Sequence, residues 1–172
     1  MDAMQNLLTR RSVRSYKNDP VPKDVLDRIL TAGTCAATGM NKQAPIIIAV
    51  TNKEMRDKLS QLNAAVMNSD RDPFYGAPVV LVVLADRAVR THVYDGSLVM
   101  GNLMNAAHAE GVSSCWIHRA KEVFDSEEGR KILASLGIEG DYEGVGNLIL
   151  GYAEGEIPEI KPRKENYVYY ID

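Results

Sequence analysis

Ala77-Pro78-Val79-Val80-Leu81-Val82-Val83-Leu84-Ala85 is the longest apolar run of the chain. Its length and its β-branched residues favour a buried strand over residues 79–84. The run is too short to cross a membrane as a helix, which needs about 20 apolar residues. We therefore expect a strand of a protein core here and no membrane partner.

Helical and strand patterns alternate on both sides of this run. A short helical pattern around Leu7 and Leu8 comes first, and Gly111 and Gly137 follow apolar periods where left-handed helix caps are expected. The predicted helices cover residues 23–36, 53–67, 93–110 and 126–136, and the predicted strands cover residues 46–50, 79–84, 113–117 and 145–152. A doubly wound parallel sheet would fit this alternation, but no strand leads into a glycine-rich dinucleotide fingerprint.

Two segments have more apolar surface than one small core needs. The helix expected at residues 93–110 is apolar around much of its circumference, which predicts a central, buried helix. The tail ends in a β-type run, Tyr167-Val168-Tyr169-Tyr170, after a stretch interrupted by prolines. We expect this run to pair outside its own core, with a second subunit.

Composition limits the classes of protein to consider. The chain has 172 residues, enough for one domain, and 45% of them are hydrophobic and 25% charged. The formal net charge of −3 argues against a generally basic nucleic-acid binder. Cys35 and Cys115 are too few for a disulfide framework, and no targeting segment is visible, so we expect free thiols and a cytoplasmic location.

Two basic clusters, Arg10-Arg11-Ser12-Val13-Arg14 and Lys161-Pro162-Arg163-Lys164, stand out from the otherwise acidic chain. Adjacent guanidinium groups repel one another unless an anion lies between them, and arginine binds phosphate in a bidentate manner. If the clusters converge, they would form a site for a phosphate monoester. The alternative is a solvated helix end and a solvated tail.

Two further segments carry side chains suited to chemistry. Thr38-Gly39-Met40-Asn41-Lys42-Gln43 offers amide donors and acceptors for the edge of a flat heteroaromatic ring, or it is an ordinary polar loop. Cys115 and His118 could form a catalytic pair, but no third orienting group is evident and Cys115 is expected to be buried in a strand. We expect no catalytic side chain and no metal site.

Taken in order, four segments resemble the nitroreductase family of FMN-dependent flavoproteins. The matching motifs are Arg10-Arg11-Ser12-Val13-Arg14-Ser15-Tyr16, Asn41-Lys42-Gln43-Ala44-Pro45, Gly111-Val112-Ser113-Ser114-Cys115-Trp116-Ile117, and Gly151-Tyr152 followed by Lys161-Pro162-Arg163. The chain departs from the family pattern at Ala44 and Ile46, and at His118 and Arg119, where longer members often carry an acidic residue and a glycine.

The resemblance implies an α+β fold with a mixed four- to five-stranded sheet flanked by helices. It implies one FMN-binding domain over residues 1–172, with a C-terminal extension at 156–172, in an intertwined homodimer with FMN at the interface. Arg10, Arg14, Lys161 and Arg163 would hold the phosphate, and the main chain of Trp116 and Ile117 would lie against the flavin ring. The full expected cofactor site is Arg10, Arg11, Ser12, Arg14, Thr38, Gly39, Asn41, Gln43, Trp116, Ile117, His118, Lys161 and Arg163.

The implied activity is that of an oxidoreductase. NADH or NADPH would reduce FMN and leave, and a nitroaromatic, quinone or similar small-molecule acceptor would then take two electrons in a ping-pong cycle. One alternative is a family branch with flavin reductase or dehalogenase activity. Another is a non-catalytic protein that binds flavin or a phosphate ligand. A DNA- or RNA-associated factor is disfavoured by the acidic remainder of the chain.

Overall fold

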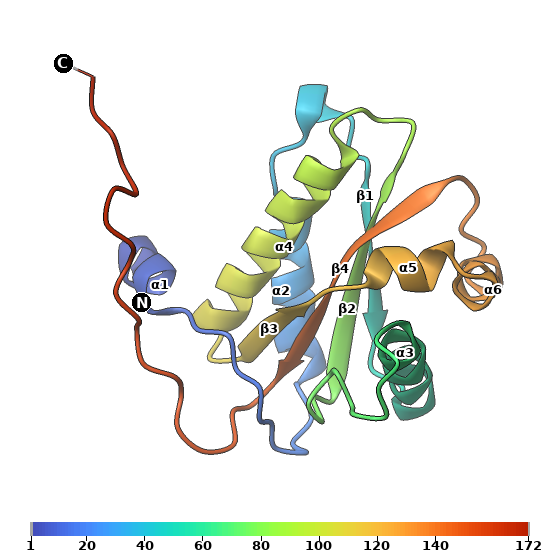
Figure 1. The fold of residues 1–172 in the computed structure, drawn as a ribbon, viewed down its shortest axis with the longest axis horizontal. Helices are drawn as coiled ribbons and strands as arrows, with labels where there is room; N and C mark the ends of the chain where they lie inside the picture. The colour runs from blue at the N-terminus through green and yellow to red at the C-terminus, as the bar shows by residue number, and fades with distance from the viewer. Residues whose placement is uncertain (1, 172) are drawn as a thin grey trace.

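The structure is a computed structural model that describes residues 2–171, so Met1 and Asp172, the ends of the predicted domain and of its extension, lie outside it. Four strands form one sheet in the order β1-β2-β4-β3, with helices on both faces (Figure 1). The strands are β1 (Pro45–Val50), β2 (Val79–Asp86), β3 (Ser113–Ile117) and β4 (Tyr142–Gly151). The helices are α1 (Ala3–Thr9), α2 (Lys23–Thr34), α3 (Lys53–Val66), α4 (His92–Ala109), α5 (Ala120–Asp125) and α6 (Glu127–Ser135), with a 3₁₀ turn, η1, at Gly39–Asn41.

All three strand pairs of the sheet are antiparallel. The doubly wound parallel sheet is therefore wrong, whereas the α+β class with four strands is confirmed. Within residues 2–171, parallel pairing is limited to the isolated bridge between Ser12 and Ser114. The alternation of helices and strands did not reveal strand direction, because a connection as long as α3 can return the chain to either end of a sheet.

The apolar run at residues 79–84 is a strand buried on both faces, as expected. Val80, Val82 and Leu84 are fully buried in a core with α3, α5 and α6. Leu81 and Val83, which point the other way, are fully buried in a second core with α2 and α4. β2 therefore divides the protein into two cores, one on each face of the sheet.

The predicted central burial of α4 is wrong within this chain. Met100 and Leu103 are fully buried against the sheet and α2, but Tyr94 and Leu98 on the same helix are 73% and 51% exposed. The sheet covers only one side of an 18-residue helix that is apolar nearly all round. Its outer face is left without cover by the described residues.

The tail leaves the body of the protein and runs past α1 (Figure 1). Tyr167–Tyr170 forms no strand with the residues that the structure describes, and Tyr169 and Tyr170 are 81% and 84% exposed. The predicted strand is thus not made within its own chain. No helix in residues 2–171 is long and apolar enough to cross a membrane.

One short helix, α5, was not anticipated in the sequence. It packs on β4 at Gly144, where an added Cβ would lie 2.3 Å from the main-chain carbonyl carbon of Ala120. Six residues carry too little periodicity to indicate a helix, since amphipathic patterns need windows of about 11 residues or more. Apart from the tail run at Tyr167–Tyr170, the predicted helices and strands are confirmed, with ends that shift by a few residues.

Asp72 anchors the loop before β2 to α3. Its Oδ2 accepts from Arg56 Nη2 at 2.5 Å and from the Gly76 N–H, and its Oδ1 accepts from Ser60 Oγ and the Phe74 N–H. Burial alone would raise the pKa of Asp72, but these hydrogen bonds outweigh it and lower the pKa below its usual value. The carboxylate is therefore held in its charged form.

We expect Asp72→Asn to lower the free energy of unfolding by about 1–2 kcal/mol at pH 7, because it removes charge-assisted hydrogen bonds at a site about a third exposed. Urea unfolding measures this, with Asp70→Asn as the exposed neighbouring control. Since the folded-state pKa is depressed, the contribution is fully present above the unfolded value of about 3.9 and is lost as pH falls through the folded pKa. Equal losses in both variants would contradict this role.

Candidate functional site

The first basic cluster lies beside the C-terminal end of α4. Helix α1 brings it there, because Asn6 donates to the Asn105 carbonyl at 3.0 Å and Thr9 Oγ1 lies 2.9 Å from His108 Nε2. The chain then leaves α1 at Arg10 and runs to the outer edge of β3. The cluster is thus fixed between a helix end and a sheet edge.

Two guanidinium nitrogens of this cluster are buried and unpaired. Arg11 Nη1 donates to the carbonyls of Leu8 and Arg10, but Arg10 Nη1 and Arg11 Nη2 have no hydrogen-bond partner among residues 2–171. Burial and the positive charges of Arg11 and Arg163 lower the pKa of Arg10. An anion bound here would pair these donors and relieve the repulsion.

The tail that carries the second basic cluster runs toward the first cluster. Arg163 is close enough to Arg10 to act on its charge, and Ile157 of the same segment lines a small cavity with Arg10, Arg11 and Ser114. Lys161 lies in this exposed segment between them. The tail therefore brings a third cationic side chain, Arg163, within electrostatic range of Arg10.

Strand β3 continues from this basic cluster along the outer edge of the sheet. Val13 N–H donates to the Ser114 carbonyl at 3.0 Å, so the main chain of Ser114 faces outward, and that of Trp116 faces the same way two residues on. Ile117 faces inward, and its carbonyl lies 3.5 Å from Asn147 Nδ2. Of the two predicted main-chain contacts, Trp116 is thus placed on the free edge and Ile117 is not.

A cavity of about 350 Å³ opens at the end of β3. Four predicted site residues line it: Arg14, Trp116, Ile117 and His118. The loop before β2 supplies further lining residues that the sequence did not predict, and its turn-rich composition was the only sign of them. These residues are Met67, Ser69, Arg71, Asp72, Pro73 and Tyr75. From Ser114, beside the basic cluster, to His118, in the cavity, the chain advances about 13 Å.

The predicted loop residues Thr38, Gly39, Asn41 and Gln43 lie at the opposite end of α4 (Figure 1). The Gly39 N–H donates to Asp95 Oδ1 at 3.0 Å, in the first turn of the helix. About 20 Å of helix separates Asp95 in this turn from His108. Within one chain the structure therefore does not bring this loop to the basic cluster.

The loop is held in an unfavourable backbone conformation. Met40, Asn41 and Gln43 all have positive φ angles near 50°, which non-glycine residues rarely adopt. Gln43 Nε2 donates to Asn41 Oδ1 at 3.2 Å, and both side chains are exposed. Such strain is typical of functional loops. The two amide side chains are therefore paired with each other at the surface of the protein.

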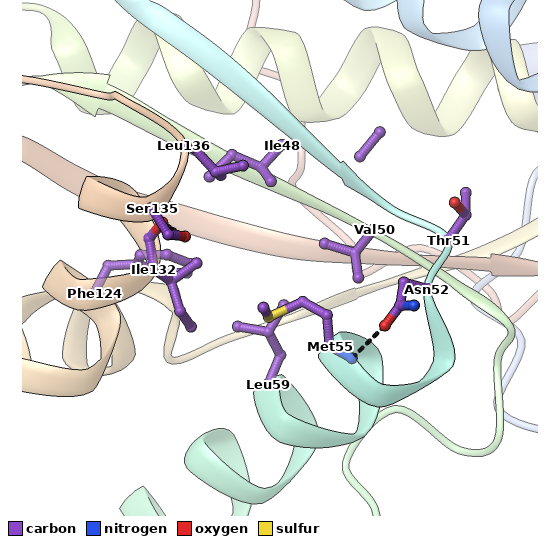
Figure 2. A pocket seen from close by; sticks show the side chains of 11 residues that line it. Ile48, Val50, Thr51, Asn52, Met55, Leu59, Phe124, Ile132, Ser135 and Leu136 are labelled. Carbon is purple, nitrogen blue, oxygen red and sulfur yellow. Dashed lines mark hydrogen bonds between the residues drawn. The ribbon is translucent and has the colours of Figure 1, made fainter.

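The remaining candidates are separate from this site. Cys115 is buried, with its Sγ 3.7 Å from the Trp116 carbonyl, and no pairing with His118 is present among the described residues. An apolar pocket of about 170 Å³ between β1, α3 and α6 holds none of the predicted site residues (Figure 2). Residues 2–171 contain no group of three side chains that could hold a metal ion.

Relatives of the chain share its sequence and its fold. A provisionally named NADH dehydrogenase/NAD(P)H nitroreductase of Methanothermobacter thermautotrophicus is 31% identical over 67% of this chain and 60% of its own. The FMN reductase [NAD(P)H] of Bacillus subtilis is 34% identical over 49% of this chain and 32% of its own. The matches thus span less than two thirds of either relative.

A nitroreductase of Bacteroides fragilis, solved with bound FMN, superposes with a TM-score of 0.90 at 27% identity over the full length of both chains. The sequence model of the nitroreductase family matches residues 7–152, most of the chain. The match includes the first basic cluster, the strained loop, the free edge of β3 and the cavity at its end. The chain therefore belongs to the nitroreductase family.

Proposed function

We propose that the chain is an FMN-dependent oxidoreductase that uses NADH or NADPH to reduce small organic acceptors. The observation that carries the proposal is the pair of buried, unpaired guanidinium nitrogens on Arg10 and Arg11, with a cavity along β3 that extends to His118, about 13 Å from Ser114. A phosphate joined to a flat ring by a ribityl chain spans such a distance. The relatives named above are FMN or NAD(P)H enzymes, which supports the same conclusion.

The residues present fit FMN. Arg10, Arg11 and Arg163, with Lys161 behind them, would bind the phosphate, and Ser12 would meet the ribityl chain as it follows β3. The outward main chain of Trp116 and the side chains of Arg14 and His118 would surround the ring. When bound, FMN supplies two-electron transfer between NAD(P)H and an acceptor. The protein's part is to bind, orient and stabilise charge.

The site is completed by a second copy of the chain. The amide groups of Asn41 and Gln43 lie at the wrong end of α4 to reach a flavin bound by their own chain. The exposed outer face of α4, with Tyr94 and Leu98, gives the apolar surface that a dimer interface needs. Across a twofold interface along α4, the loop of one copy would meet the basic cluster of the other.

The tail would join the partner's sheet as its fifth strand. β1 is the other edge of the sheet, with the apolar pocket of Figure 2 on one face and a cavity of about 490 Å³, lined by Leu30 and Val99, on the other. The Tyr167–Tyr170 run alternates large side chains that could enter both. A tail bound there would cover what β1 leaves exposed.

The purified protein is expected to be yellow, or to become yellow on addition of FMN, and NADH or NADPH should bleach the flavin band without oxygen. Visible absorbance measures both steps. A flavin that is bound but never bleached would favour the non-catalytic alternative. Failure to bind FMN at all would contradict the proposal.

Arg10→Ala and Arg163→Ala should each weaken FMN binding about 10- to 100-fold, because each removes a charge-assisted hydrogen bond. If both side chains hold one phosphate, the double variant should lose less than the product of the two effects. Fluorescence titration with FMN measures this, and Arg130→Ala on α6 is the control. Strictly multiplicative losses would mean that the two clusters do not share a ligand.

Deletion of residues 166–172 should shift the protein from dimer toward monomer, because it removes the proposed fifth strand and leaves the basic cluster at 161–164 in place. Light scattering coupled to size-exclusion chromatography measures the mass. FMN binding should weaken in parallel as the dimer is lost. A full-length monomer with bound FMN would refute the interface site.

A further inference from the structure

The cavity at the end of β3 is lined by more arginines than the proposed flavin contacts use. Three arginines line it, Arg14, Arg71 and Arg119, and Asp72 is the one carboxylate among its lining residues. Arg14 is already assigned to the flavin. Arg71 and Arg119 therefore need another role or another counter-charge.

Asp72 does not supply that counter-charge. Both of its oxygens are occupied by hydrogen bonds, to Arg56 and Gly76 on Oδ2 and to Ser60 and Phe74 on Oδ1. The buried Arg56 guanidinium forms an ion pair with the Asp72 carboxylate. Arg71 comes from the loop before β2, which forms one wall of the cavity, and Arg119 comes from the end of β3, which forms another. Neither arginine has an ion-pair partner among the lining residues.

Arg119 is fixed in place by a buried support. It has a φ of +74°, and its Nε donates to Asn63 Oδ1 at 2.9 Å. Asn63 is fully buried and donates in turn to the His118 carbonyl at 2.8 Å. The side chain of Arg119 thus keeps a defined direction, and its two terminal nitrogens have no partner among residues 2–171. That pair is the group that binds a carboxylate in a bidentate manner.

The other wall combines a cation with an aromatic ring. Arg71 has an exposed side chain without a hydrogen-bond acceptor in the described residues, and Tyr75, 43% exposed, lines the same cavity with a φ of +53°. Backbone strain at both Tyr75 and Arg119 indicates that these positions are held for a purpose other than folding. A flat ring bearing an anionic group matches both walls.

We propose that this cavity selects anionic aromatic electron acceptors, with Arg119 and Arg71 binding a carboxylate or sulfonate of the acceptor. The inference rests on the proposed oxidoreductase function and names the substrate class of that same site. With a nitroaromatic acid, NAD(P)H and one proton supply two electrons and two protons. The nitro group becomes a nitroso group and releases water, while the acid group remains bound and unchanged.

A matched pair of acceptors tests the proposal on the FMN-loaded protein. 4-Nitrobenzoate and 4-nitrobenzamide have nearly the same shape and differ by one negative charge. The wild-type ratio of kcat/KM for benzoate over amide should exceed one and should fall with added salt, since charge steering is screened. The ratio is internal to each preparation, so a partly folded or partly loaded variant does not distort it.

Arg119→Gln and Arg71→Gln should each lower this ratio about 10-fold, the loss of one charge-assisted interaction, and mainly through the KM for the benzoate. Arg119→Lys should retain part of the preference, because it keeps the charge without the bidentate group. Arg130→Gln, on the surface of α6, is the matched control and should leave the ratio unchanged.

Ratios that stay at the wild-type value in both Arg119→Gln and Arg71→Gln would overturn the inference, while turnover of the amide would leave the proposed oxidoreductase intact. A wild-type ratio at or below one would overturn it in the same way. Failure of the wild-type protein to reduce either acceptor, despite bound FMN and NAD(P)H, would instead refute the proposed function together with the inference.

Discussion

The burial of β2 on both faces is the constraint on which the rest of the structure depends. A strand whose side chains are all buried must be covered twice, so the chain places α2 and α4 on one face and α3, α5 and α6 on the other. The inner faces of these helices pack on the central strands and are not available to cover other surfaces. What stays uncovered is the outer face of α4 and the two sheet edges, β1 and β3. The architecture thus leaves free the surfaces that the proposed dimer and the proposed cofactor site require.

The candidate site uses the free edge of β3 rather than the interior of the protein. Its beginning is marked by unpaired guanidinium nitrogens on Arg10 and Arg11, and its end by a cavity rich in arginine. One strand therefore aligns the basic cluster with the cavity. The buried Asn63 holds the side chain of Arg119, and the carboxylate of Asp72 ties the loop before β2 to α3. Buried hydrogen bonds therefore position the charged side chains of that cavity.

Much of the fold could be predicted from local pattern, because the strands and long helices have clear periodicities. Strand direction could not, since helical connections allow either return. The basic cluster could be picked out from the sequence because its adjacent like charges need an anion, but the position of Arg14 in the cavity, away from the unpaired nitrogens of Arg10 and Arg11, could not. The walls formed by Arg71, Tyr75 and Arg119 were not, because they meet only through hydrogen bonds between α3, the loop before β2 and the end of β3. The position of Asn41 far from the cluster likewise depends on the three-dimensional path of α4.

The most direct test of the central claim is a crystal structure of the protein with FMN. The account predicts the phosphate within hydrogen-bond distance of Arg10 and Arg163, the ring against the main chain of Trp116, and Asn41 of a second copy at the ring edge. A flavin bound with its phosphate away from Arg10, or held wholly by one chain, would contradict it.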